Sequence, residues 1–205
     1  MTVQFTIVNI GTLSMNRFWG ETERVRSATA TCVLLETEGQ RLLVDPSPGP
    51  EELEPMLFAR TGLRPAQIDA VFVTHFHGDH RYGLELFAHA TWLMAESGLH
   101  EWQARSPQDG GLIDRFLPAE GKLPGALALF PSPGHTLGHH GLLMDARWGR
   151  TIVAGDAVMT QDFFDAEEGF HNCVDFELAT ETIRTIKERA DWVIPGHGNL
   201  IMCSG

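Results

Sequence analysis

The chain has 205 residues, 43% of them hydrophobic, and this length predicts one domain over residues 1–205 with almost no room for a second folded module. The formal net charge is −12 and no run of basic residues occurs, which disfavours a broad, unassisted contact with nucleic acid. No stretch approaches the ~18 continuous apolar residues that a membrane-spanning helix needs.

The amino terminus and the cysteines indicate the compartment. The opening MTVQFTIVNI lacks the basic segment and the long apolar stretch of a signal peptide, and its alternating pattern predicts a first strand. Cys32, Cys173 and Cys203 have no paired spacing and are too few for a disulfide framework, so three free thiols are expected. We therefore expect a soluble, cytoplasmic protein without a membrane partner.

The first half of the chain predicts strands at residues 3–10, 28–36, 41–45, 69–74 and 91–95, and helices at 51–60, 83–88 and 97–105. The turn Glu38-Gly39-Gln40 makes a hairpin of the second and third strands. The second half predicts strands at 126–130, 141–145, 151–154 and 192–194, and one helix at 176–189. This order favours a mixed α/β fold, in which layered sheets are covered by helices.

Two long segments show neither the helical nor the strand-like spacing of apolar residues. Residues 11–27 and 157–173 mix aromatic with charged side chains, and loops of this length inside a compact domain tend to be lids or binding loops. The sequence leaves open whether either segment closes over a site.

A dense group of metal-type ligands follows the apolar strand at residues 70–73. His75, His77, Asp79 and His80 fall within six positions, a density that a solvated loop rarely needs. If the segment stays extended, His75 and His77 project to the same side because side chains alternate along a strand. Asp79 and His80 then follow at a turn, where they can face a second metal.

Three more donors stand in the same setting downstream. His135, Asp156 and His197 each follow an apolar run through a short turn that contains glycine. Active residues of α/β proteins collect at the carboxyl ends of strands, so we expect four strands to direct their donors at one edge of the sheet. The seven residues together predict a centre for two divalent metal ions. Zinc suits histidine and carboxylate donors best, and iron and manganese accept the same set.

Such a centre supports hydrolysis. Two divalent ions roughly 3.5 to 4 Å apart can share a water, lower its pKa toward neutrality and make the bridging hydroxide the nucleophile. A carbonyl or phosphoryl oxygen on one ion is polarised, and charge on the leaving atom is stabilised by the other. Asp79 is the candidate catalytic residue, because it can orient the hydroxide or carry a proton to the leaving group.

The order of these motifs resembles the metallo-β-lactamase superfamily: His-x-His-x-Asp-His, then Pro-Gly-His-Thr, Gly-Asp and Pro-Gly-His-Gly, over nearly the whole chain. The resemblance implies a four-layer αββα sandwich with the metals in the cleft between the sheets. It also implies a first metal on His75, His77 and His135, a second on Asp79, His80 and His197, and Asp156 as the bridge.

The superfamily includes β-lactamases, thioesterases, lactonases, persulfide dioxygenases and nucleases, so the metal site alone does not name a substrate. Members that hydrolyse antibiotics commonly have a cysteine at the position of Asp156, and that activity is disfavoured. The chain stops a few residues after His197, without the carboxyl-terminal helical module of the glyoxalase II type, and it lacks a β-CASP-type insertion. Lactonases carry a tyrosine shortly after the bridging aspartate, where this chain has Ala157-Val158-Met159-Thr160.

Candidate substrate contacts lie beside the ligands. Arg81 and the only tyrosine, Tyr82, follow the His-Asp motif, and either they contact a substrate anion or Arg81 pairs with a nearby acid. The segment at 157–173 adds aromatic residues that either line the cleft or pack in the core, and a histidine that can reach a substrate: Phe163, Phe164, Phe170 and His171. His139 and His140 favour packing or hydrogen bonding behind the ligands. His89 and His100 receive no role.

The sequence thus favours a metal-dependent hydrolase that cleaves a small-molecule ester, thioester or lactone. One alternative is a metal-dependent nuclease or phosphodiesterase, since phosphodiesters also suit two metals, although the absent basic surface opposes it. A non-catalytic protein that binds or senses metal is the other alternative. A persulfide dioxygenase would need one iron and would leave His80 and His197 less necessary.

Overall fold

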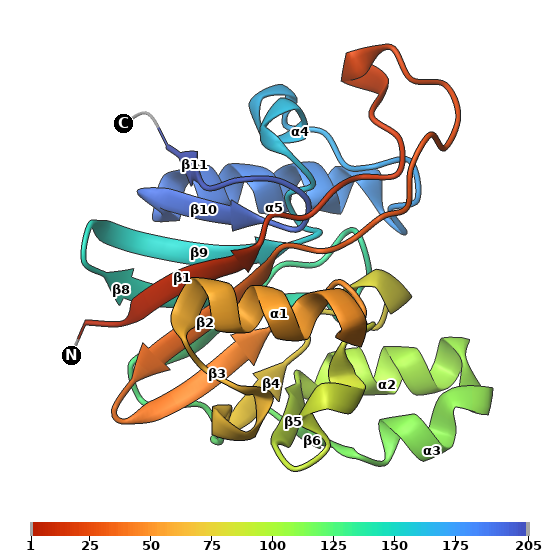
Figure 1. Ribbon diagram of the computed structural model, residues 1–205. Coiled ribbons are helices and arrows are strands. Elements are labelled where there is room, and N and C mark those ends of the chain that lie inside the picture. Colours follow the sequence, from red (N-terminus) through yellow and green to blue (C-terminus); the bar gives the residue numbers. More distant parts are fainter. Residues whose placement is uncertain (1, 204–205) are drawn as a thin grey trace.

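Two β-sheets lie face to face in the computed structural model, which describes residues 2–203 (Figure 1). The first sheet has six strands in the order β1 (Gln4–Asn9), β2 (Cys32–Thr37), β3 (Gln40–Val44), β4 (Ala70–Phe72), β5 (Thr91–Met94) and β6 (Phe116–Pro118). The second has five in the order β11 (Ile201–Met202), β10 (Trp192–Pro195), β9 (Gly149–Gly155), β8 (His140–Ala146) and β7 (Leu127–Pro131).

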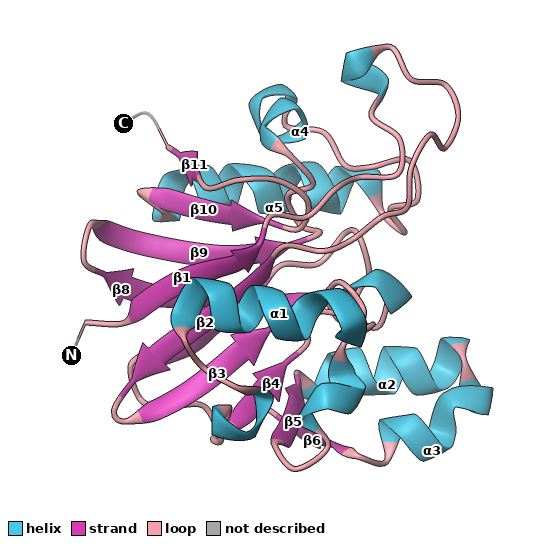
Figure 2. Cartoon of the chain, viewed as in Figure 1, coloured by secondary structure: helices cyan, strands magenta, loops and turns pink. Residues whose placement is uncertain are grey.

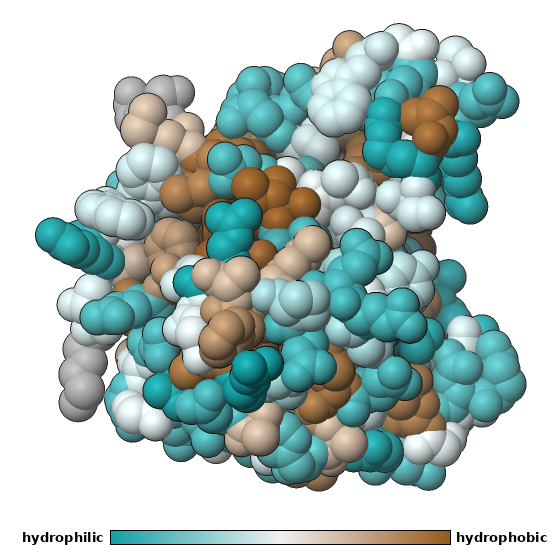
Figure 3. All heavy atoms as spheres, in the orientation of Figure 1, coloured by the Kyte–Doolittle hydropathy of each residue, from teal (hydrophilic) through white to brown (hydrophobic). Residues whose placement is uncertain are grey.

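Helices cover the outer faces of both sheets (Figure 2). Within the described residues the α-helices are α1 (Pro50–Thr61), α2 (Glu96–Arg105), α3 (Gly110–Ile113), α4 (Gln161–Ala166) and α5 (Phe176–Arg189). Short 3-10 turns lie at Arg17–Trp19, Pro65–Gln67, Gly78–His80, Leu84–Phe87 and Pro107–Asp109. No helix in residues 2–203 has the length and apolar character to cross a membrane. The face in Figure 3 mixes a largely hydrophilic surface with smaller apolar patches.

Three apolar layers hold these elements together. One layer packs α1 and α2 against the outer face of the first sheet, with Leu53 and Trp102 in its core. The middle layer lies between the sheets, where Val33 and Leu35 of β2 meet Leu142 of β8. The third places Ile183 and Ile186 of α5 on the outer face of the second sheet. The predicted four-layer αββα sandwich is therefore confirmed.

The alternating side chains of β2 explain this layering. Val33 and Leu35 point to the middle layer, whereas Leu34, one position between them, packs toward the helices. Because both faces of the strand are covered, its apolar run is nearly continuous. The predicted hairpin with β3 is confirmed, with Thr37 opposite Gln40. Glu38 and Gly39 form its turn at φ values of 54° and 76°, the left-handed region that such two-residue turns require.

Two predicted segments are wrong in type. Residues 83–88 form only the single turn Leu84–Phe87 instead of a helix, because the chain reaches β5 at Thr91 three residues after Ala88. The segment 157–173 is not an uninterrupted loop, since α4 occupies its centre. Within α4 the adjacent Phe163 and Phe164 are both buried, and six residues are too short to show a helical period.

Strand direction places the loops that matter at one end of the sandwich. β4 is parallel to β3 and β5, while β7 and β9 are both antiparallel to β8 and β10 is parallel to β9. The carboxyl ends of β4, β7, β9 and β10 meet at this end. The long segment 11–27 extends beside α4 there, in red to orange at the upper right of Figure 1.

Candidate metal centre

The loop after β4 carries four of the predicted ligands. It stays extended through His77, whose backbone has φ −63° and ψ 147°, and then makes the 3-10 turn Gly78–His80. His75 and His77 therefore project to the same side, as predicted, and Nε2 of His75 lies 2.9 Å from Nδ1 of His77. The turn directs Asp79 and His80 toward a second position, and His80 is fully buried.

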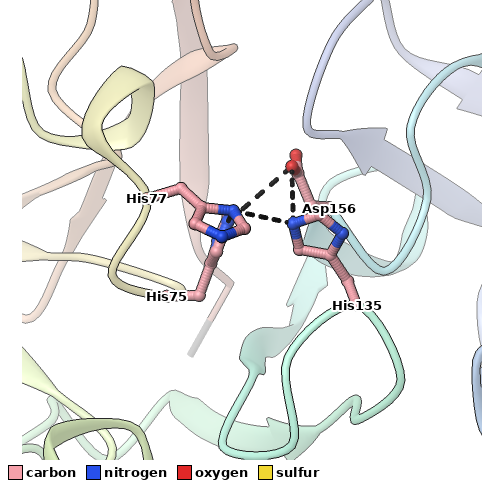
Figure 4. A group of neighbouring side chains, drawn as sticks. All are labelled: His75, His77, His135 and Asp156. Carbon is pink, nitrogen blue, oxygen red and sulfur yellow. Dashed lines mark hydrogen bonds and ion pairs between the residues drawn. The ribbon is translucent and has the colours of Figure 1, made fainter. Parts of the chain in front are cut away.

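The other three ligands come from the second sheet. His135 follows β7, Asp156 follows β9 and His197 follows β10. The expectation that all four strands belong to one sheet edge is wrong, because β4 lies in the first sheet and the other three lie in the second. Figure 4 shows the result, with the two histidines of the β4 loop facing His135 and Asp156 from the opposite side. The ligands thus meet across the seam between the sheets.

The first group of donors is His75, His77, His135 and Asp156. Their ligand atoms all lie within 4.8 Å of one another. Nε2 of His135 is 2.9 Å from Nδ1 of His77 and 3.2 Å from Oδ2 of Asp156. Nε2 of His75 is 3.7 Å from the same oxygen.

The second group is Asp79, His80 and His197, whose ligand atoms also lie within 4.8 Å of one another. Nε2 of His197 is 3.6 Å from Oδ2 of Asp79. The other carboxylate oxygen of Asp156, Oδ1, faces this group, 3.0 Å from Nε2 of His80 and 3.2 Å from Nε2 of His197. Asp156 therefore turns one oxygen to each group.

The donor atoms of each group are of the types and at the spacing that a metal ion needs. Nε2 of His80 and Oδ1 of Asp156 are buried and face each other at 3.0 Å, where a cation can take the place of the proton between them. Two ligand nitrogens on one tetrahedral zinc, each bonded at ~2.0–2.1 Å, stand roughly 3.3 Å apart. The 2.9–3.7 Å separations in the first group bracket that value.

Burial and the shared carboxylate set the protonation states of the metal-free site. Burial lowers the pKa of His135 to about 3 and holds that of His75 well below its usual value, so both rings are neutral and offer lone pairs. Burial alone would raise the pKa of Asp156, yet His80, His197 and His135 hold it well below its usual range. A cation that binds here replaces protons shared between these groups, so binding releases protons.

A buried carboxylate that the sequence analysis missed orients two ligands. Oδ2 of Asp45, at the end of β3, lies 2.8 Å from Nδ1 of His80 and accepts a 2.9 Å hydrogen bond from the hydroxyl of Thr74. Oδ1 accepts from the Thr74 backbone N–H at 2.8 Å. Thr74 Oγ1 in turn lies 3.1 Å from Nδ1 of His75. The available signal was the position of Asp45, which follows an apolar strand as the other donors do.

The rings of His197 and His135 are held by different partners. Nδ1 of His197 lies 2.9 Å from the backbone oxygen of Thr29, and Nδ1 of His135 lies 3.9 Å from Sγ of Cys173. The turn before His197 also needs a glycine, because a Cβ at Gly196 would collide with Oδ1 of Asp156. All three cysteines are free thiols, as predicted.

Both ligand groups open into one pocket of about 730 Å³. Its walls come from the β4 loop, the segment 11–27 and the segment 157–173. Tyr82 and His171, two of the predicted substrate contacts, line this pocket. Phe170 lines it as well and separates it from an adjoining cavity of about 450 Å³, whose wall also includes Phe163.

Four further residues singled out in the sequence lie near the donor groups or in the core behind them. Phe164 packs in the core beneath α5 and does not line the metal pocket, and Phe163 lies against Phe18 with ring centroids 5.0 Å apart. His139 is fully buried against the ring of His75, and its Nδ1 lies 2.8 Å from the hydroxyl of Ser132, so the predicted packing role is confirmed. His140 lies behind the site, with Nδ1 3.1 Å from the backbone oxygen of Gly138.

Arg81 turns away from the metal pocket. Its guanidinium donates to the backbone oxygen of Phe76 at 2.9 Å, lies 4.7 Å from the ring centroid of Trp102 and is 3.6 Å from a carboxylate oxygen of Asp109. Of the two roles left open by the sequence, pairing with an acid is the one that the structure supports. Arg81 therefore stabilises the β4 loop on the side that faces away from the metal pocket.

We expect Arg81→Gln to act on stability rather than on substrate binding. Loss of the stacked, hydrogen-bonded guanidinium should lower the free energy of unfolding by about 1–2 kcal/mol. Urea denaturation of the variant and the parent protein measures this difference. A variant of unchanged stability that instead raises KM selectively would contradict the assignment.

Comparison with known proteins agrees with this architecture. Residues 28–197 match the Metallo-beta-lactamase superfamily. The N-acyl homoserine lactonase of Bacillus cereus is 27% identical over 191 residues, which cover 77% of this chain and 74% of that protein. Metallo-beta-lactamase domain-containing protein 1 of Xenopus laevis is 30% identical over 147 residues, which cover 67% of this chain and 57% of that protein.

Solved structures share the fold across almost the whole chain. A putative metallo-beta-lactamase from Thermotoga maritima superposes with a TM-score of 0.72 at 20% identity, covering 98% of this chain and all of that one. AidC, described as a dizinc quorum-quenching lactonase in complex with a product, superposes with a TM-score of 0.66 at 16% identity, covering 83% of this chain and 72% of that one. The chain belongs to the metallo-beta-lactamase superfamily and is a metal-dependent hydrolase of that superfamily.

Proposed function

We propose that this enzyme hydrolyses a small-molecule ester, thioester or lactone at a centre of two metal ions, zinc in both positions. His75, His77 and His135 hold the first ion, Asp79, His80 and His197 hold the second, and Asp156 gives one oxygen to each. The observation that carries the proposal is the shared carboxylate of Asp156, which lies between two compact donor groups at the wall of one pocket.

The size and charge of the site favour a small substrate. A pocket of about 730 Å³ falls in the usual range for small-molecule sites, and a chain of net charge −12 lacks the basic surface that nucleic acids need. The lactonases among the relatives support the same class, as does a similar lactonase structure in complex with a product, whereas a ribonuclease Z that is 35% identical over 108 residues belongs to another class. Histidine and carboxylate donors, together with the dizinc lactonase of the same fold, favour zinc.

Protein side chains beside the metal ions have separate roles in the proposed reaction. Bound metal ions supply a water of lowered pKa and a Lewis acid for the carbonyl oxygen. Asp79 reaches the pocket with a partly exposed side chain, so its carboxylate can accept the proton of the attacking water and return it to the leaving oxygen or sulfur. Tyr82 and His171 line the same pocket, where their side chains can contact the substrate.

Replacement of Asp79 tests the proton-transfer role. We expect Asp79→Asn, which keeps an oxygen in the ligand position, to lower kcat by about 10²–10⁴-fold because the amide cannot accept the proton. Steady-state kinetics on a panel of esters, thioesters and lactones, with zinc content measured by atomic emission, would show the loss. The matched control is Asp114→Ala. Asp114 is exposed and lies 35 positions after Asp79 in the sequence, and its replacement should leave kcat unchanged.

Two outcomes would count against the proposal. If Asp79→Asn kept the parent kcat, Asp79 would have no role in proton transfer. If the zinc-loaded parent turned over no member of the panel, the assignment of substrate class would fail, whatever the variants did.

A further inference from the structure

The lining of the metal pocket is less acidic than the protein as a whole. Among the described residues, Asp79 and Asp156 are the only acidic side chains in its lining, and Arg24 and Arg26 lie there as well. The whole chain has a formal net charge of −12. This cluster of two cations offsets the charge of Asp79 and Asp156, so the pocket repels an anion less than the rest of the acidic protein does.

The two arginines of this cluster differ in what holds them. Arg26 pairs with Glu21 and donates a 2.8 Å hydrogen bond to the backbone oxygen of Leu13, so its guanidinium is occupied inside the loop. Arg24 is exposed and forms neither an ion pair nor a side-chain hydrogen bond with any residue in the described range 2–203. Its five N–H donors are therefore available to a ligand.

The backbone around Arg24 is held in place. The N–H of Val25, the next residue, donates to the backbone oxygen of Ser14 at 3.0 Å, and Thr12 pairs with Thr29 at the base of the segment. Its other side is tied to α4, because Asn16 and Trp19 both donate to one oxygen of Asp162, at 3.1 and 2.9 Å. Arg24 is thus presented to the pocket from an anchored segment.

We propose that Arg24 binds an anionic group of the substrate, a carboxylate or a phosphate, at the end remote from the bond that is cleaved. This inference rests on the proposed function and narrows its substrate to acidic esters, thioesters or lactones. The planar guanidinium matches either oxyanion with two parallel hydrogen bonds. Arg24 takes the role that the sequence suggested for Arg81, which is occupied behind the loop.

Matched esters test the specificity. The 4-nitrophenyl ester of glutaric acid has a free carboxylate, the corresponding ester of glutaramic acid is neutral and of equal size, and an ester with a terminal phosphonate represents phosphates. We expect the zinc-loaded parent enzyme to favour at least one anionic ester over the neutral glutaramic acid ester by about tenfold in kcat/KM. The better of the two anionic esters identifies the group.

Substitution of Arg24 should remove that preference. In Arg24→Gln the kcat/KM for the anionic esters should fall to that for the neutral glutaramic acid ester. The kcat/KM for the neutral ester should stay within about twofold of the parent value. Arg24→Lys should retain part of the preference, because it keeps the charge without the two-pronged geometry. Arg150→Gln, an exposed arginine at the start of β9, is the control and should change nothing.

A binding measurement separates this inference from the proposed function. Glutaranilic acid, an amide analogue of the glutarate ester, is titrated by calorimetry into metal-free protein, where a carboxylate cannot bind zinc. We expect about tenfold weaker binding to Arg24→Gln than to the parent. If this holds while no ester is hydrolysed, the proposed function fails and the anion site stands. If the esters are hydrolysed without preference, or glutaranilic acid binds Arg24→Gln as tightly as it binds the parent, the anion site is refuted.

Discussion

Replacement of Asp156 by alanine is expected to disable both halves of the metal centre at once. Its two oxygens face different donor groups, Oδ2 at 3.2 Å from His135 and Oδ1 at 3.0 Å from His80. Each group then loses the only carboxylate that it shares with the other, while five neutral or positively charged histidine rings remain close together. We expect bound zinc to fall from two ions per chain to at most one, and kcat/KM to fall by at least about 10³-fold.

Zinc content and kinetics on the same samples measure these effects. Asp145→Ala is the matched control, because Asp145 lies on the neighbouring strand β8 with its side chain 82% exposed and outside the site. It should keep both ions and full activity. An Asp156→Ala protein that retained two ions and the parent rate would remove the basis for a shared-carboxylate centre.

The residues of the two donor groups could be predicted from the sequence because each donor obeys a local rule. His135, Asp156 and His197 all follow apolar runs that form buried strands, and the carboxyl ends of these strands meet in the fold. His75 and His77 share a side because they are two positions apart in an extended segment. Local periodicity alone was sufficient for these five residues.

Features that depend on contacts between distant segments could not be predicted. The sequence gives no signal that β4 belongs to one sheet and β7 to the other, because both are short apolar runs. Arg81 pairs with Asp109, 28 positions away, and only the packing of α2 brings Trp102 beneath it. Arg24 lies in a segment without a period, where charge alone does not reveal which arginine is already paired.

Asp45 shows a different limit, since its residue type and position both matched the rule for donors. It lies 2.8 Å from Nδ1 of His80, on the side of the ring opposite the nitrogen that faces Asp156. Such a carboxylate orients a ligand and fixes the ring nitrogen that carries the proton. The sequence cannot separate a carboxylate that binds metal from one that supports a ligand, because the distinction lies in which face of the histidine it meets.

Replacement of Asp45 by alanine should therefore cause the largest loss of stability among the variants considered. Three donors would lose their acceptor in the core: the backbone N–H of Thr74, its hydroxyl and Nδ1–H of His80. Breaking a buried, charged network by removing one partner typically costs about 3–5 kcal/mol. The second metal site should also bind zinc about 10–100-fold more weakly, because His80 loses its orienting partner.

Urea denaturation of metal-free protein and competitive zinc titration measure the two effects of Asp45 separately. Asp69→Ala is the control for loss of an acceptor, since Asp69 is exposed and accepts from the backbone N–H of Arg41 at 2.8 Å, and it should cost far less. Asp45 also has a φ of 48°, which asparagine tolerates better than alanine. Asp45→Asn therefore separates charge from backbone conformation, and it should recover part of the stability but little of the zinc affinity. Equal stability of Asp45→Ala and Asp69→Ala would show that the network behind His80 does not support the site.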